Sequence, residues 1–235
     1  MDRVIPPAPC RGRLAAVSLA SALALSMWAA RAGWAGPRLL FLVWNLGLAW
    51  VPWLAARALS RASSAAGSAA LGALWLLFLP NAPYLVTDLV HLRARPPVPP
   101  WFDLLLFAGF GLAGCALAWA SIEIVHARLA LALGRARAAT AIAVVLFLTG
   151  FGVYLGRFLR WNSWDVVSEP GALLAGAAAA LASPRALAFS ALFGAFVGAG
   201  YLAAAPRIGP LSSPAATRSG PAGPCSSGRS GPPRR

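Results

Sequence analysis

Two polar stretches interrupt an otherwise apolar sequence, and they hold the side chains best suited to chemistry. The first, residues 76–92, reads LLFLPNAPYLVTDLVHL, and the second, residues 156–165, reads GRFLRWNSWD. A bilayer offers no water to freed backbone groups, so a broken helix at membrane depth needs protein or a wet cavity around it. The two prolines of the first stretch therefore predict a helix break that takes part in function.

The run from Pro80 to Tyr84 has two interpretations. It can be a discontinuous helix whose freed backbone groups bind a ligand, as in transporters. It can also be a helix that ends with Asn81 as a left-handed cap and continues into a proline turn. Both interpretations break the helix at Pro80, but only the first makes the break functional.

Asp88 and His91 are three residues apart and share one face if their segment is helical. Together with Asp103 they can supply oxygen and nitrogen ligands to a metal ion. No metal motif of diagnostic spacing is present, so the favoured interpretation pairs Asp88 with Arg157 or Arg160. His91 then lies at the membrane interface.

Arg157 and Arg160 are also three residues apart, at the end of an apolar run. The planar fork of arginine suits phosphate or carboxylate, so the two side chains can clamp an anion. The alternative is that both extend to lipid headgroups. Asn162 and Asp165 follow closely and predict a lined pocket. Three tryptophans are candidates for its walls: Trp101, Trp161 and Trp164.

The candidate polar cluster has members in both stretches and one at the start of the next apolar run. Its members are Asn81, Tyr84, Asp88, His91, Asp103, Arg157, Arg160, Asn162 and Asp165. The sequence assigns no catalytic residue, no metal and no cofactor to this cluster.

Glu123 and His126 have the spacing of half a di-iron carboxylate motif, but the partner motif and the extra glutamates are missing. The favoured interpretation is an ion pair between Glu123 and Arg128. The sequence contains no G-x-S-x-G, Walker A or H-E-x-x-H motif. Its three cysteines are too scattered to indicate a disulfide framework or a metal site.

The elements that must position these residues follow from composition. Of the 235 residues, 59% are hydrophobic and only 11% are charged, with a mean hydropathy of +0.70. A soluble domain of this size needs more polar surface. We therefore predict an all-α fold, a polytopic membrane helix bundle of about six transmembrane helices with a broken third helix.

Six apolar runs are expected to cross the membrane. They are residues 14–30, 37–56, a third run from 65 through the break to about 88, 101–126, 138–156 and 185–205. Residues 171–182 are expected to be helical but too short to span. The chain thus divides into a polar N-terminal segment (1–13), the bundle (14–205) and a disordered tail rich in Pro, Gly, Ser and Arg (206–235).

The first run also has features of a signal peptide, with Ala30-Arg31-Ala32 as an A-x-A cleavage site. However, this run is longer than a typical signal-peptide core, and another span follows almost at once. An uncleaved first helix is therefore favoured.

All 20 basic residues are arginine, and the net charge is +14. They lie in loops and in the tail, not on a basic helix with interleaved aromatic residues, which argues against nucleic-acid binding. The expected partners are the lipid bilayer and its anionic headgroups. The distribution of arginine predicts a multi-pass protein of the cell membrane with cytoplasmic termini. Six spans then place both polar stretches on the extracytoplasmic side.

Several short motifs occur in a fixed order: residues 78–84 (FLPNAPY), 87–89 (TDL), 91–92 (HL), 101–103 (WFD), 156–160 (GRFLR) and 162–165 (NSWD). In these motifs the sequence resembles the bacterial membrane-protein family called domain of unknown function 1361. The similarity covers roughly residues 39–201. It implies an integral membrane protein with several helices, and it implies no activity, substrate or catalytic residue.

Three hypotheses about function follow. The first is that the polar cluster binds or transports a small molecule or ion. The second is a membrane-embedded enzyme acting on a lipid or lipid-linked substrate, with Asp88, His91 or Asp165 as acid–base or metal-binding groups. The third is a structural or accessory subunit that docks a partner through these loops.

Overall fold

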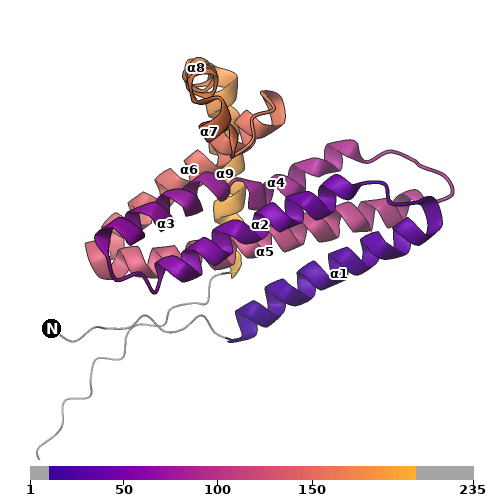
Figure 1. Ribbon diagram of the computed structural model, residues 1–235, viewed down its shortest axis with the longest axis horizontal. Coiled ribbons are helices and arrows are strands. Elements are labelled where there is room, and N and C mark those ends of the chain that lie inside the picture. The colour runs from indigo at the N-terminus through magenta and orange to yellow at the C-terminus, as the bar shows by residue number, and fades with distance from the viewer. Residues whose placement is uncertain (1–10, 205–235) are drawn as a thin grey trace, which may run out of the picture. The chain divides into compact units, whose positions relative to one another are not determined.

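The computed structural model describes residues 11–204, and all the secondary-structure elements in that range are helical (Figure 1). Six of the helical segments are long and apolar enough to cross a membrane, by length and composition. The predicted all-α fold is confirmed. The elements are α1 (Arg11–Ala35), α2 (Leu40–Leu59), α3 (Ala65–Phe78), α4 (Asn81–Thr87), the 3-10 helix η1 (Asp88–His91), α5 (Pro100–Leu133), α6 (Arg135–Phe158), α7 (Asp165–Ser168), α8 (Pro170–Leu181) and α9 (Pro184–Ala204).

The third apolar segment consists of α3, α4 and η1 together, Ala65–His91. The helix predicted over residues 171–182 is present as α8. The first ten residues of the predicted polar segment and the predicted tail from 206 to 235 lie outside the described residues.

Two predicted boundaries are wrong. The stretch from Arg128 to Arg137 was expected to be a loop, but α5 continues to Leu133 and only Gly134 separates it from α6. Gly134 has φ +85°, a conformation that costs glycine little, and it allows this abrupt junction. The second run was expected to start its helix at Pro37, but α2 begins at Leu40.

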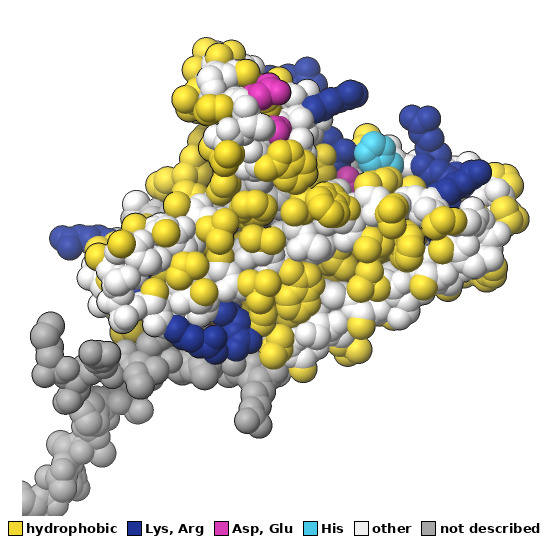
Figure 2. Space-filling model, in the orientation of Figure 1, with side chains coloured by type: hydrophobic (Ala, Val, Ile, Leu, Met, Phe, Trp, Pro, Cys, Tyr) yellow, Lys and Arg dark blue, Asp and Glu magenta, His cyan; other side chains and the backbone are white. Residues whose placement is uncertain are grey.

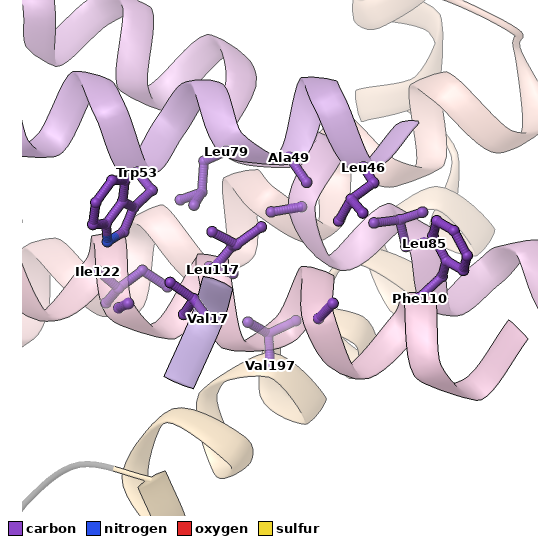
Figure 3. Close-up of a cluster of buried hydrophobic side chains, with 14 of the residues drawn as sticks. Val17, Leu46, Ala49, Trp53, Leu79, Leu85, Phe110, Leu117, Ile122 and Val197 are labelled. Atoms are coloured by element: carbon purple, nitrogen blue, oxygen red, sulfur yellow. The ribbon is translucent and has the colours of Figure 1, made fainter. Parts of the chain in front are cut away.

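Helix α5 lies at the centre of the bundle. It packs against α1, α2, α4, α6 and α9, and 67% of its most apolar window is buried, more than in any other long helix. Figure 3 shows Leu117 of α5 among side chains from α2, α1 and α9. A helix that is apolar on all sides is typical of the interior of a bundle or of a membrane span, and α5 combines a largely buried middle with exposed apolar side chains such as Leu112.

Small residues allow α6 and α9 to approach closely. A Cβ on Gly150 of α6 would overlap the backbone of Ser190, and a Cβ on Gly194 of α9 would lie 2.6 Å from the carbonyl oxygen of Leu146. Membrane helices associate through such small residues because lipid leaves no hydrophobic drive between them. Hydrophobic side chains are spread over the face of the bundle shown in Figure 2, and many large apolar side chains of the described residues are exposed.

The end of the bundle away from the polar stretches has its own charged contacts. Arg13 Nε lies 2.8 Å from Glu123 Oε2. Arg128 instead donates to the carbonyl oxygens of Leu59, at 2.5 Å, and Ala62, at 3.2 Å, so it caps the end of α2. The predicted ion pair between Glu123 and Arg128 is therefore wrong, because a basic side chain from α1 takes the carboxylate.

Candidate functional site

The helix break at Pro80 is present, but it is not a left-handed cap. Leu79 and Pro80 keep right-handed helical dihedral angles, and Asn81 begins α4. The helix is interrupted because proline has no N–H to donate and its ring crowds the preceding turn. The interpretation that made Asn81 a left-handed cap is wrong.

One side chain from each polar stretch satisfies a backbone carbonyl at the break. Asn81 Nδ2 donates to the Phe78 carbonyl oxygen at 3.1 Å and to Ser163 Oγ at 2.8 Å. Ser163 Oγ donates in turn to the Leu77 carbonyl oxygen at 3.3 Å. The two polar stretches, which are far apart in the sequence, therefore meet at the break.

Two glycines of α6 make this approach possible. A Cβ on Gly152 would overlap the ring of Pro80, and a Cβ on Gly156 would lie 3.3 Å from the ring of Tyr84. Any larger residue at position 152 would have to displace a rigid proline ring, so this position holds α6 against the break.

Arg157 binds one face of α4 and η1. Its Nη2 donates to Thr87 Oγ1 and to Asp88 Oδ1, both at 2.6 Å. Its Nη1 lies 3.2 Å from His91 Nε2, and its guanidinium lies 4.4 Å from the centre of the Tyr84 ring. Spacings of three and four residues place all four partners on one helical face.

Asp88 is buried, with 1% of its surface exposed, and it is bonded from two sides. Arg157 supplies the opposite charge, and Asn45 Nδ2 of α2 donates to Asp88 Oδ2 at 3.1 Å. The favoured pairing of Asp88 with an arginine of the second stretch is confirmed, and Arg157 is that arginine. A polar side chain inside an apolar span is expected to form an interhelical hydrogen bond, and Asn45 forms one here. The sequence did not identify Asp88 as its partner, because nothing in it relates α2 to the break.

Asp103 is not bonded to this group. It forms two parallel bonds with Arg31 of α1, Nε to Oδ1 at 2.6 Å and Nη2 to Oδ2 at 3.2 Å. Among residues 11–204, no group of three or more His, Cys, Asp or Glu side chains is placed to hold a metal ion. The Asp88, His91 and Asp103 ligand set is therefore not assembled.

Arg31 is the residue that sequence reasoning overlooked, having treated it only as part of a cleavage site. It is fully buried in α1. The available signal was a lone arginine near the end of an apolar run with no acid on its own helix. Such a charge needs an acidic partner from another element.

Arg160, Asn162 and Asp165 lie in the connection after α6. Arg160 is exposed, follows the end of the helix and has φ +63°, so it does not form a clamp with Arg157. Asp165 Oδ2 accepts from the backbone N of Asn162 at 2.6 Å and from its Nδ2 at 3.3 Å. Asp165 thus closes a local turn ahead of α7.

A pocket of about 210 Å³ lies beside the break. It is bordered by α2, the broken helix, α6, the connection after α6 and α8. We call it the tryptophan pocket, after three of its lining residues: Trp44, Trp161 and Trp164. Its main polar lining residues are Asn45, Asn81, Tyr84, Asn162 and Ser163. Trp101, expected here from the sequence, is 60% exposed at the start of α5 and does not line it.

Residues 44–199 match the family described as Protein of unknown function (DUF1361). The chain belongs to this family. The matched region includes the lining of the tryptophan pocket, the break and Arg157, but it leaves out α1. No curated protein and no solved structure matches the chain.

Proposed function

We propose that this protein is an integral, multi-pass protein of the cell membrane that binds a small polar molecule in the tryptophan pocket. Six long apolar helices and the family membership support the membrane assignment. The arginine distribution favours cytoplasmic termini, lipid headgroup contacts through arginine and a pocket on the extracytoplasmic side.

One observation carries the proposal: the helix break, the amide side chains and the second polar stretch all border the same cavity. Irregular backbone at membrane depth is tolerated where it is covered by protein or lines a wet cavity, and here it does both. A concave site with aromatic walls and a few convergent polar groups is the usual form of a small-molecule site.

Binding fits the site better than the enzyme hypothesis does. Asp88 is buried and bonded to Arg157 and Asn45, so it is not free to exchange a proton with a substrate. Asp165 accepts bonds from its own turn. Transport would further require the pocket to open toward the other side of the membrane.

The test compares two exposed tryptophans, one inside the pocket and one outside. Trp164 lines the pocket and is 43% exposed, whereas Trp101 is 60% exposed and does not line it. Replacing either side chain by alanine should leave the bundle folded. The wild type, Trp164→Ala and Trp101→Ala would be purified in lipid nanodiscs and melted with glucose, choline chloride, glycine or inorganic phosphate.

We expect at least one probe to raise the melting temperature of the wild type and of Trp101→Ala, but not of Trp164→Ala. A ligand at a hundredfold its Kd stabilises the folded state by about 2.7 kcal/mol, a readily measured shift. If no probe produces a shift that depends on Trp164, the cavity is only a packing feature and the proposal is wrong.

A further inference from the structure

We infer that the tryptophan pocket takes an uncharged ring bearing several hydroxyl groups, the chemistry of a single sugar unit. This inference rests on the proposed binding function and names its ligand class. It follows from the orientation of the amide side chains, the indole walls, the charge around the pocket and its size.

Two lining amides have an orientation fixed by their partners. Asn45 Nδ2 faces the Asp88 carboxylate, which accepts but cannot donate while it is paired with Arg157. Asn81 Nδ2 faces the carbonyl oxygen of Phe78, which also can only accept. An amide flip would place oxygen against oxygen in both places, so neither assignment is arbitrary.

The amide oxygens of these lining residues are therefore left as acceptors without a bonded donor. Within residues 11–204, no donor is bonded to Oδ1 of Asn45 or Asn81, or to Oδ1 of Asn162, whose Nδ2 bonds to Asp165. A ligand that satisfies them must donate hydrogen bonds. Hydroxyl groups donate and accept, whereas a phosphate or carboxylate group that only accepts would face these oxygens without a bond.

The indole rings supply flat apolar walls. Trp44 and Trp164 meet at an interplanar angle of 72° with centroids 6.5 Å apart, one from α2 and the other from the connection after α6. The face of an aromatic ring carries partial negative charge and attracts the slightly positive hydrogens of an aliphatic C–H face. A sugar ring combines such a C–H face with a rim of hydroxyls, which matches indoles and amides side by side.

The local charge disfavours a cation. Aromatic cages bind quaternary ammonium groups, so three indoles alone would also suit that class. Here, however, the Arg157 guanidinium already lies over the ring of Tyr84, and the nearby carboxylate of Asp88 is paired with it. The lining of the pocket itself has no charged side chain.

The size limits the ligand to one ring. The cavity of about 210 Å³ is smaller than the roughly 300–1,000 Å³ of sites that enclose drug-sized ligands. The sugar can come from the water phase or from a lipid headgroup. Trp44 also borders an apolar groove with Leu40, Phe41, Val43 and Gly47, and an acyl chain could follow that groove.

The experiment uses the full chain in phosphatidylethanolamine nanodiscs, which lack choline. The probes are glucose, a glucosyl diacylglycerol built into the disc, choline chloride and inorganic phosphate, each titrated against thermal stability. The proteins are the wild type, Trp164→Ala, Trp164→Phe and the control Trp101→Ala. Trp164→Phe keeps an aromatic wall and separates loss of stacking from loss of folding.

We expect glucose or the glucosyl lipid to bind saturably to the wild type and to Trp101→Ala. Trp164→Ala should weaken this binding at least about tenfold, with a smaller loss in Trp164→Phe. Binding of the lipid-linked sugar alone would support the sugar class and assign a membrane source.

Saturable, Trp164-dependent binding of choline or phosphate without sugar binding would overturn the ligand class and leave the binding function standing. Absence of binding by every probe would overturn both.

Discussion

Two buried carboxylates of this bundle are each paired with an arginine, but their surroundings differ. Asp103 and Arg31 are both only 1% exposed in their side chains and are joined by two parallel bonds. Asp88 is buried in the same way, but the side chain of its partner Arg157 is 15% exposed and divides its bonds among several groups of α4 and η1. The first pair is closed to water, although the partly exposed Arg95 lies 3.8 Å from Asp103, and the second pair is partly open through Arg157.

This difference separates a contact that only joins two helices from one that adjoins the proposed binding pocket. The closed pair joins α1 to α5, and α1 lies outside the matched family region. The open pair joins the broken helix to α6 beside the tryptophan pocket, within that region. A buried ion pair is weak evidence for stability by itself, but removing one partner leaves an uncompensated charge.

Asp103→Ala should have the largest effect, because it leaves the fully buried Arg31 without a counter-charge. We expect a loss of about 3–5 kcal/mol in the free energy of unfolding, measured by reversible denaturation in mixed micelles. The double variant Arg31→Leu, Asp103→Leu removes both charges and should recover most of this loss. A loss below about 1 kcal/mol in the single variant would show that the pair is not closed.

Asp88→Ala should cost less, about 1–3 kcal/mol, because Arg157 retains its bonds to Thr87 and partial access to water. The same unfolding measurement applies. Asn45→Ala is the matched control, since it removes the other bond to Asp88 and leaves the charge pair intact. A cost equal to that of Asp103→Ala would remove the contrast between the two pairs.

Gly152→Ala tests the break without changing either ion pair. Its new methyl group would overlap the ring of Pro80, so we expect a loss of about 1–3 kcal/mol and a reshaped pocket. Gly72→Ala in α3 is the control, because nothing lies within 4 Å of its Cβ position. Thermal melts of both variants give the comparison, and equal melting temperatures would contradict the close contact.

Glu123→Gln should have the smallest effect. The Arg13–Glu123 pair at the other end of the bundle is 26% and 33% exposed in its side chains. Exposed pairs contribute less than about 1 kcal/mol, so the melting temperature should scarcely change. A large drop in melting temperature would mean that the Arg13–Glu123 pair also contributes strongly to the stability of the bundle.

The helices were largely predictable because each apolar run is long and bounded by polar residues. The junction of α5 and α6 was not, since Ala, Leu and Arg are all strong helix formers and continue the helix through residues expected to form a loop. The break at Pro80 was predictable from proline chemistry. The right-handed helical conformation that the chain keeps through the break was not predictable. Proline and asparagine occur both at helix ends and at kinks within a continuing helix, so the sequence does not distinguish the two.

The candidate site was predictable in part. Opposite charges expected on one membrane side pointed to the pair of Asp88 and Arg157, which is present. The same reasoning grouped Asp103 with them, but Arg31 binds it instead. An expected position on the same side of the membrane narrows the possible partners of a charged residue but does not choose among them. The packing of α1 on α5 determines that Asp103 pairs with Arg31. For the same reason the sequence did not identify Asp88 as the partner of Asn45, or Trp44 as part of the pocket.

The most direct test is whether the break and the second polar stretch meet. In a chain whose native cysteines are replaced by serine, Asn81→Cys and Ser163→Cys would be combined and treated with a short bifunctional thiol reagent. Ser68→Cys with Ser163→Cys is the control, because position 68 lies nine residues, or about 14 Å of helix, before Leu77. Rapid cross-linking of the first pair alone is the predicted result. Absence of that cross-link, or labelling of positions 81 and 163 from opposite sides of the membrane, would contradict a shared site.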